Sequence, residues 1–167
     1  MRDFLHVNVY CVEYAGYGIL KEQKPSAKQI GLDCICFVKY LIEFKQIPAK
    51  NMILMGKSIG TGFATYVASK IDVGGLILVS PFLSIRHIVK DFLGGFGAFF
   101  MKETLLNSQE LIKKVTCPTL LIHGKKDGLI SFKHSQILYE NLNPNIKIKM
   151  IKIFPDMDHT NMLLYEH

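Results

Sequence analysis

The feature that most constrains the fold is the pentapeptide Gly56-Lys57-Ser58-Ile59-Gly60, because of the segments on either side of it. An apolar run over residues 51–55 precedes it, and a helix-like run over residues 61–70 follows it. A G-x-S-x-G motif between a strand and a helix is typical of a sharp turn that lifts its serine above the end of a sheet. Such a turn strains the backbone and excludes bulky side chains two positions before and after the serine. Gly56 and Gly60 meet that need.

Ser58 is therefore a candidate nucleophile, and the same turn supplies a candidate oxyanion donor. The backbone N–H of Ile59 lies at the start of the predicted helix, where it would face an oxyanion formed beside Ser58. A serine hydroxyl with such a donor beside it suits acyl transfer. The motif by itself is short enough to recur by chance, so the rest of the chain must support the interpretation.

Composition indicates a globular chain. With 167 residues and 49% apolar content, the chain is long enough to bury a core and too apolar to be disordered. No apolar run reaches the roughly 18 to 20 residues needed to span a bilayer. The N-terminal stretch carries His6, Asn8 and Glu13, which is untypical of a signal peptide. We therefore expect a cytoplasmic protein.

Charge and cysteine content narrow the expected partners. A formal net charge of +6 favours acidic surfaces such as anionic lipid or nucleic acid. The lysines are scattered, however, with pairs only at 113–114 and 125–126, which argues against nucleic-acid binding. Contact with a membrane surface is an expectation for a longer form only. The cysteines lie in apolar stretches without zinc-ligand spacing, so we expect buried thiols, no metal and no other cofactor. The sequence does not predict an oligomeric state.

Strand-like and helix-like patterns alternate along the chain. A helical pattern over residues 26–45 has Ser26 as its candidate cap and a continuous apolar stripe. Strand-like runs, several of them nearly continuous in Val, Ile and Leu, occur at residues 5–14, 51–55, 75–80, 119–122 and 146–153. Alternation of this kind implies right-handed crossovers between parallel strands. The predicted architecture is α/β, with a doubly wound, mostly parallel sheet.

One stretch, residues 86–116, interrupts the alternation. It contains an apolar, glycine-containing patch over residues 92–101. The patch fits a loosely ordered connection packed on the core, or a small cap that offers an apolar wall to an acyl chain. Neither interpretation requires a second domain. We expect residues 1–167 to form one domain with a short cap-like insertion.

Two further residues complete a catalytic constellation with Ser58. A serine nucleophile needs a base to take its proton and an acid to orient that base. Asp127 follows the run 119–122, and His159 follows the run 146–153. Because the carboxyl ends of parallel strands meet at one edge of a sheet, the three side chains should lie close together. Their order along the chain, Ser then Asp then His, is the order found in enzymes with this elbow.

Other side chains fit these roles less well. His123 precedes the turn that carries Asp127 and is expected to hold that loop. Asp156 and Asp158 lie close to His159 in sequence, and the carboxylate of such a neighbour seldom reaches the Nδ1 atom, so Asp127 is the better candidate acid. The remaining histidines lack a partnered context and are expected to be structural or at the surface: His6, His87, His134 and His167. Three tyrosines are expected to be packing residues: Tyr14, Tyr17 and Tyr66.

With these residues the chain resembles the α/β-hydrolase superfamily, and within it the abhydrolase-domain serine hydrolases of the family 17 type, which include protein depalmitoylases. The matching segments cover nearly the whole chain: residues 13–18, 25–26, 56–61, 80–82, 117–124, Asp127 and His159. The resemblance implies a Ser58–Asp127–His159 triad that hydrolyses acyl-lipid or acyl-protein esters or thioesters through an acyl-enzyme. A serine peptidase of the same fold, similar to the S33 aminopeptidases, is the alternative.

The resemblance also implies segments that precede Glu13, where this sequence has only twelve residues. In the family, earlier strands and a His-Gly loop supply a second oxyanion N–H, and a further helix covers the sheet after the histidine. Two interpretations follow. The chain is part of a longer hydrolase, an α/β-hydrolase fold lacking the first strands. Alternatively, Ile59 is its only oxyanion donor, which would lower kcat by on the order of 10² to 10³ and leave a weak enzyme or a non-catalytic binding or scaffold protein.

Overall fold

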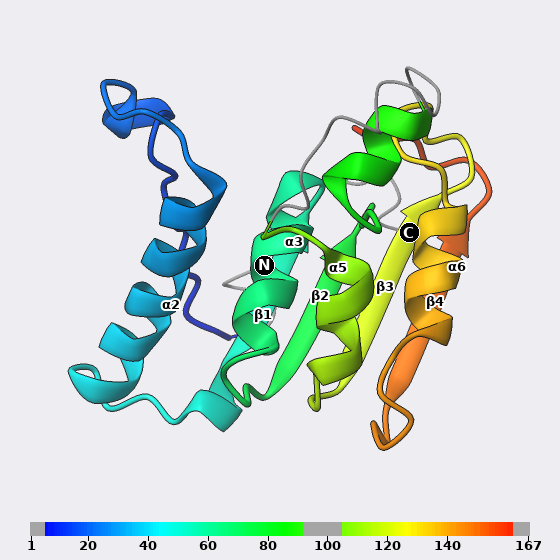
Figure 1. Cartoon of the computed structure of the whole chain (residues 1–167). Helices are drawn as coiled ribbons and strands as arrows, with labels where there is room; N and C mark the ends of the chain where they lie inside the picture. Colours follow the sequence, from blue (N-terminus) through cyan, green and yellow to red (C-terminus); the bar gives the residue numbers. More distant parts are fainter. Residues whose placement is uncertain (1–5, 92–104, 162–167) are drawn as a thin grey trace.

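The computed structural model describes residues 6–91 and 105–161, which are built around one sheet (Figure 1). The sheet has four strands in the order β1-β2-β3-β4. The strands are β1 (Ile53–Lys57), β2 (Gly75–Val79), β3 (Thr119–Gly124) and β4 (Lys149–Phe154). Each neighbouring pair is parallel. The predicted parallel α/β architecture is confirmed.

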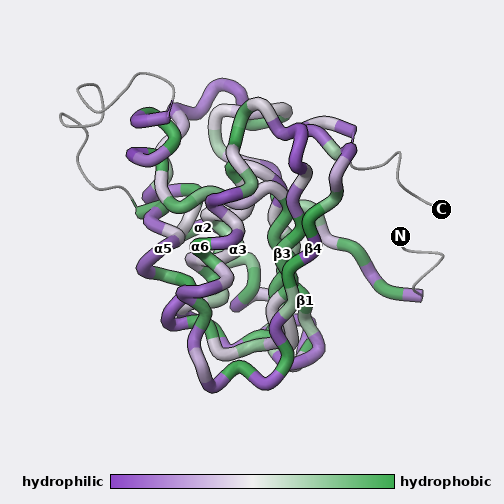
Figure 2. Tube along the Cα trace, turned by 90° about the vertical axis from the view of Figure 1, so that its right-hand side faces the viewer, coloured by the Kyte–Doolittle hydropathy of each residue, from purple (hydrophilic) through white to green (hydrophobic). Residues whose placement is uncertain are grey.

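Helices connect the strands and cover one face of the sheet. The α-helices are α2 (Ala27–Glu43), α3 (Ile59–Ala68), α5 (Ser108–Leu111) and α6 (Lys133–Glu140). Short 3₁₀ turns occupy η1 (Gly18–Leu20), η2 (Ala49–Asn51) and η3 (Ile112–Lys114). Figure 2, turned by 90° from Figure 1, shows the labelled helices on one side of the strands.

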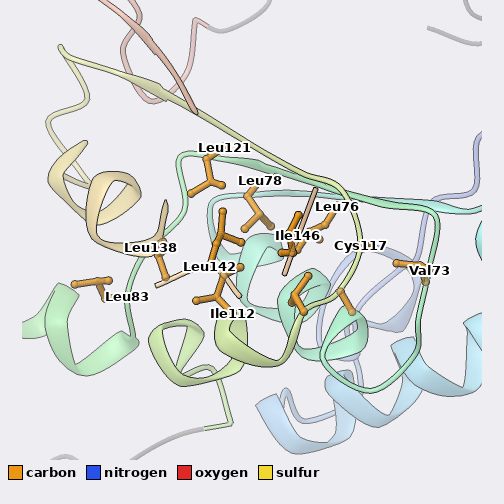
Figure 3. Close-up of a cluster of buried hydrophobic side chains, with 12 residues drawn as sticks. Val73, Leu76, Leu78, Leu83, Ile112, Cys117, Leu121, Leu138, Leu142 and Ile146 are labelled. Atoms are coloured by element: carbon orange, nitrogen blue, oxygen red, sulfur yellow. The ribbon is translucent and has the colours of Figure 1, made fainter. Parts of the chain in front are cut away.

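Two apolar clusters hold these layers together. The first lies between the sheet and helices α3 and α6, where Leu78 and Leu121 of adjacent strands meet Leu138 (Figure 3). The second joins α2 to α3, where Ile30 and Val38 pack with Phe63 and others. As predicted, the Ser26 side chain caps α2 and an apolar stripe on this helix is buried. The first cluster fixes the strand ends from which the site residues emerge.

The opposite face of the sheet carries an apolar row. Cross-strand register places Met55, Ile77, Leu120 and Met150 side by side on the four strands. The central pair is partly buried, whereas Met55 and Met150 are 45% and 48% exposed. Among the described residues, no helix lies on this face (Figure 2).

The strand predicted at residues 5–14 is not present, so that prediction is wrong for residues 6–14, the part of it that the structure describes. Val7, Val9 and Tyr10 are all exposed in this segment. A run of apolar residues forms a strand only where a neighbouring strand accepts its backbone hydrogen bonds, and in the described part of the chain this segment pairs with none. The other strands agree with prediction to within a few residues; β1 begins late because residues 49–51 form the η2 turn.

The predicted insertion at residues 86–116 lies partly outside the described residues, as does the whole apolar patch at 92–101. In the described part, residues 85–91 are helical. The chain returns at α5 and η3, and an isolated bridge joins Ser84 to Asn107. The cap-like role of the insertion therefore stays a prediction.

The cysteines agree only partly with the prediction of buried thiols. Cys34 and Cys117 are buried, and burial raises the pKa of the Cys34 thiol to about 11, with a smaller contribution from the charge of Asp33. Cys11 and Cys36 are exposed, so the prediction is wrong for them. Cys36 lies two positions from Cys34 on α2 and therefore faces the other way, whereas Cys11 lies in the unpaired N-terminal segment.

Candidate active site

Ser58 lies at the apex of a sharp turn between β1 and α3. Its φ of 51° and ψ of −121° are unusual for a residue with a side chain. Such a conformation costs about 1–3 kcal/mol and persists only where the surroundings enforce it. The N–H of Ser58 donates to the carbonyl of Val79 at 2.9 Å, which continues the β1–β2 pairing up to the turn. The first residue of α3 follows directly.

The two glycines of the turn do not contribute equally. A Cβ atom on Gly56 would lie 2.6 Å from the carbonyl carbon of Gly60 and 2.7 Å from the Cα of Thr61. Both are backbone atoms of α3, so they cannot move aside. A Cβ atom on Gly60 would meet only the Tyr14 hydroxyl, at 3.5 Å, which is ordinary contact. The steric requirement predicted for both positions is therefore strict at Gly56 and loose at Gly60.

The structure brings the three predicted site residues together. The Nε2 atom of His159 lies 3.0 Å from the Oγ of Ser58, and its Nδ1 atom lies 2.8 Å from Oδ2 of Asp127. An ionised carboxylate only accepts hydrogen bonds, so Nδ1 carries a proton and donates it. Nε2 is then free to accept the proton of the Ser58 hydroxyl. The imidazole is thus held in the tautomer that a general base for Ser58 requires.

Asp127 is well prepared to act as the partner of His159. Its carboxylate is fully buried, and burial on its own raises the pKa of this carboxyl group. Hydrogen bonds outweigh that effect, and the pKa is lowered overall. The N–H groups of Ile130 and Leu129 donate to Oδ1 at 2.8 and 3.0 Å. A carboxylate that accepts several such bonds stays ionised, so it can stabilise a neighbouring imidazolium.

His123 holds the loop that carries Asp127, as predicted. It is completely buried, its Nε2 atom lies 2.9 Å from the carbonyl oxygen of Ile130, and its Nδ1 atom lies 2.6 Å from Oγ of Ser135. A carbonyl only accepts, so Nε2 carries the proton and the Ser135 hydroxyl donates to Nδ1. Burial lowers the pKa of His123, which agrees with this neutral form. His123 thereby joins β3, the Asp127 loop and α6.

Gly124 brings the His159 loop against the end of β3, a role that the sequence analysis missed. A Cβ atom on Gly124 would overlap the carbonyl group of Met157. That same carbonyl accepts a hydrogen bond from the N–H of Lys126 at 3.1 Å, so the loops carrying Asp127 and His159 are joined backbone to backbone. A His-Gly pair at the end of a buried strand was the available signal, but only the structure shows what approaches it.

The start of α3 provides the candidate oxyanion donor. Ile59 is the first helical residue, so its N–H has no carbonyl partner within the helix. The side chains of Thr61 and Thr65 donate to backbone carbonyls of the same segment, which ties down the first turns. Such an N–H at a fixed helix N-terminus suits a developing negative charge next to Ser58.

The rival acids stand apart from the imidazole, as predicted. Asp156 pairs with Lys126 at the surface, at 2.7 Å. Asp158 accepts hydrogen bonds from the backbone of Asn161 and Thr160, which lower its pKa and shape the loop around His159. Asp127 is the carboxylate that reaches Nδ1.

Two histidines predicted to lack partners have them. His134 is buried; its Nδ1 atom accepts from the N–H of Leu83 at 3.1 Å, and its Nε2 lies 2.8 Å from Asp91. His87 lies 2.8 Å from the hydroxyl of Ser84. The prediction that these two histidines lack partners is therefore wrong. The partners of His134 are distant from it in sequence, so no local pattern indicated them. The contacts of both residues agree with the structural role that was predicted.

The tyrosines considered as packing residues behave differently from one another. Tyr14 packs against Phe63 with ring centroids 5.1 Å apart, and burial raises its pKa to about 12, with a smaller contribution from Cys34. Tyr17 is 59% exposed, so the packing prediction is wrong for it, whereas Tyr66 is partly buried beside Gly31. Tyr14 therefore supports the base of α3 through packing.

A cavity of about 470 Å³ adjoins the Asp127 loop. Its lining combines apolar residues with charged and polar ones, among them Leu83, Phe132, His87 and Lys125. Ser58 and His159 do not line it. Asp127 is the one of the three predicted site residues that does. Among the described residues, no cluster of His, Cys, Asp and Glu could hold a metal ion, and no helix is long and apolar enough to cross a membrane.

Solved structures share this arrangement of strands and helices. Acetyl xylan esterase 1 from Thermoanaerobacterium matches with a TM-score of 0.63 at 21% identity over 80% of this chain and 48% of its own. An esterase of Pyrococcus furiosus matches with a TM-score of 0.62 at 21% identity over 82% of this chain and 57% of its own. At this level of identity the likeness establishes the α/β-hydrolase fold.

Sequence relatives lead to the family. The chain is 33% identical over 143 residues to the α/β-hydrolase domain-containing protein aho-3 of Caenorhabditis elegans, covering 86% of this chain and 42% of that protein. It is 33% identical over 141 residues to the α/β-hydrolase domain-containing protein 17C of Mus musculus, covering 81% and 41%. The chain thus spans less than half the length of these relatives. The sequence profile of the family described as Serine hydrolase (FSH1) matches residues 21–155, and the chain belongs to this serine hydrolase family.

Proposed function

We propose that the chain cleaves carboxylic esters or thioesters, with Ser58 as nucleophile, His159 as general base and acid, and Asp127 as the group that orients His159. One observation carries the proposal. A continuous hydrogen-bonded row runs from the Ser58 hydroxyl through both imidazole nitrogens of His159 to the Asp127 carboxylate, at 3.0 and 2.8 Å. Family membership and the strained turn at Ser58 support it.

In the acylation half of the reaction, the Ser58 oxygen attacks the acyl carbonyl carbon while its proton passes to Nε2 of His159. The carbonyl oxygen becomes an oxyanion that accepts a hydrogen bond from the N–H of Ile59. The intermediate collapses, the bond to the leaving group breaks, and His159 returns the proton to the departing alcohol or thiol. An acyl ester on Ser58 remains.

Deacylation repeats these steps with water. His159 takes a proton from a water molecule as the water attacks the acyl-enzyme, and the bond to Ser58 breaks as that proton returns to the serine oxygen. The products are a carboxylic acid and the regenerated enzyme. The ionised Asp127 stabilises the imidazolium that forms in both halves.

The proposed substrates are acyl lipids or acylated proteins. The resemblance to the family 17 type supports them, as do two apolar side chains next to site residues: Ile59 is 50% exposed and Leu129 is 49% exposed. An exposed apolar group beside the nucleophile, as Ile59 is, suits an acyl chain. A peptide is the alternative substrate for the same site. A cytoplasmic location and contact with a membrane surface stay predictions.

The test is hydrolysis of matched ester and thioester series of rising acyl length, together with a peptide amide, by the 167-residue chain. We expect long acyl chains to be cleaved faster than short ones, and Ser58→Ala to abolish turnover. Ser69→Ala, at the other end of α3, is the matched control and should leave activity unchanged. Preference for short, water-soluble esters would overturn the lipid assignment. A folded chain that binds acyl ligands without turning any of them over would favour the non-catalytic alternative.

A further inference from the structure

Ser80 directly follows β2 and occupies an unusual position. It is completely buried, and its N–H donates to the carbonyl of Ile122 on β3 at 2.8 Å. Its φ is 48°, a left-handed conformation that normally favours glycine. A residue with a Cβ atom pays about 1–2 kcal/mol for this conformation. The choice of serine over glycine at this point calls for a role for the side chain.

The hydroxyl of Ser80 is a buried polar group beside the Asp127 carboxylate. It contributes to keeping the pKa of Asp127 below its usual value. Yet its oxygen makes no hydrogen bond of standard geometry in this conformation. A buried hydroxyl without a partner costs about 1–3 kcal/mol, which favours a side-chain adjustment that gives it one. A small change in the Cα–Cβ torsion of Ser80 moves the hydroxyl oxygen, and the neighbouring carboxylate is the acceptor that it would reach.

The other groups around the carboxylate are already accounted for. Oδ1 accepts from the backbone of Leu129 and Ile130. Oδ2 faces Nδ1 of His159 at 2.8 Å and Nε2 of His123 at 3.3 Å, and these two histidines are the titratable groups that face Asp127 from β3 and from the loop after β4. The proton on Nε2 of His123 is directed mainly to the carbonyl of Ile130, at 2.9 Å. Leu129, Ile130 and His159 thus supply three donors, and a carboxylate can accept about four hydrogen bonds.

We infer that Ser80 is a positioning residue, whose hydroxyl donates a hydrogen bond to the Asp127 carboxylate and fixes it in the orientation that accepts Nδ1–H of His159. The inference rests on the proposed function, since it concerns the proposed triad of Ser58, His159 and Asp127. A backbone-only explanation, in which Ser80 merely tolerates the left-handed turn, makes a different prediction for glycine at this position.

The first experiment measures the pH dependence of kcat/KM for Ser80→Ala and Ser80→Gly. A carboxylate that has lost a donor attracts the imidazolium of His159 more strongly. We therefore expect the acid limb of both variants to move to higher pH by about 0.5–1 pH unit, the equivalent of one hydrogen bond. We also expect kcat to fall about tenfold with KM within a factor of two.

The glycine variant distinguishes the effect of losing the hydroxyl from an effect of the backbone conformation, because it relieves the left-handed strain and still lacks the donor. It also remains informative if the alanine variant folds poorly. If Ser80→Gly keeps the wild-type acid limb and kcat, the backbone explanation holds and the inference is overturned.

A second measurement does not depend on turnover. The proton between Nδ1 of His159 and Asp127 can be observed as a low-field resonance in NMR spectra of Ser58→Ala. Adding Ser80→Gly should move this resonance further downfield, because the carboxylate has become a stronger acceptor. An unchanged resonance would refute the inference about Ser80. Ester hydrolysis that persists in Ser58→Ala would refute the proposed function and leave the NMR comparison valid.

Discussion

Gly56 is the residue on which the turn beneath Ser58 depends most directly. A Cβ atom there would lie 2.6–2.7 Å from backbone atoms of Gly60 and Thr61, whereas Gly60 has room for one. We expect Gly56→Ala to lower the unfolding free energy by about 1–3 kcal/mol, as overpacking does, and to abolish hydrolysis. Gly60→Ala should stay within about 0.5 kcal/mol of wild type. Urea unfolding of both variants, with activity assays alongside, tests this. Equal losses in the two variants would contradict the difference in packing.

His123 makes stability depend on pH. Burial lowers its pKa from the usual 6.5, so below that pH the unfolded chain binds a proton that the folded chain does not. The unfolding free energy should therefore be at its full value above about pH 6.5 and decline as the pH falls below it. His123→Asn removes this titration. Urea unfolding between about pH 7.5 and 5 should give a flatter profile for the variant, although its absolute stability is lower. Parallel profiles would show that His123 is not held neutral by burial.

The close contact between the His159 loop and the end of β3 leaves no room for a larger side chain. We expect Gly124→Ala to push this loop away, because its Cβ atom would overlap the Met157 carbonyl. A displacement of about 1 Å at a catalytic base costs on the order of 10²-fold in rate, so kcat should fall by about that factor. Gly128→Ala, in the loop that follows β3, is the control, since a Cβ atom there meets nothing within 4 Å. A Gly124→Ala variant with wild-type kcat would show that the contact does not position His159.

The sequence predicted most of the elements that carry the site, and it predicted their meeting point. Parallel strands bring their carboxyl ends to one edge, so residues that follow β1, β3 and β4 had to converge whatever the details of the loops. It failed where an outcome depends on a partner far away in sequence. Residues 7–12 are rich in valine, as strands often are, but stay unpaired in the described part of the chain, and His134 meets Asp91. The same limit hid Gly124 and Ser80, because their importance lies in which backbone or carboxylate approaches them.

As a whole, the described molecule is a one-sided layer. Helices α2, α3, α5 and α6 lie on one side of the sheet (Figure 2). The row that the strand register forms from Met55, Ile77, Leu120 and Met150 belongs to the other side. The candidate active site lies at the carboxyl edge of the sheet, where the segments that follow β1, β3 and β4 each supply one of its three residues. The fold therefore presents the proposed nucleophile, base and acid on a rigid, parallel framework.

The central claim is that Ser58 is an activated nucleophile in this chain. The most direct measurement is intact-mass analysis of the 167-residue chain after reaction with a fluorophosphonate, an electrophile that activated serines attack. We expect one adduct on the wild-type chain and on Ser69→Ala, none on Ser58→Ala, and much slower labelling of Asp127→Asn. Labelling that persists in Ser58→Ala, or a folded wild-type chain that stays unlabelled, would contradict the account.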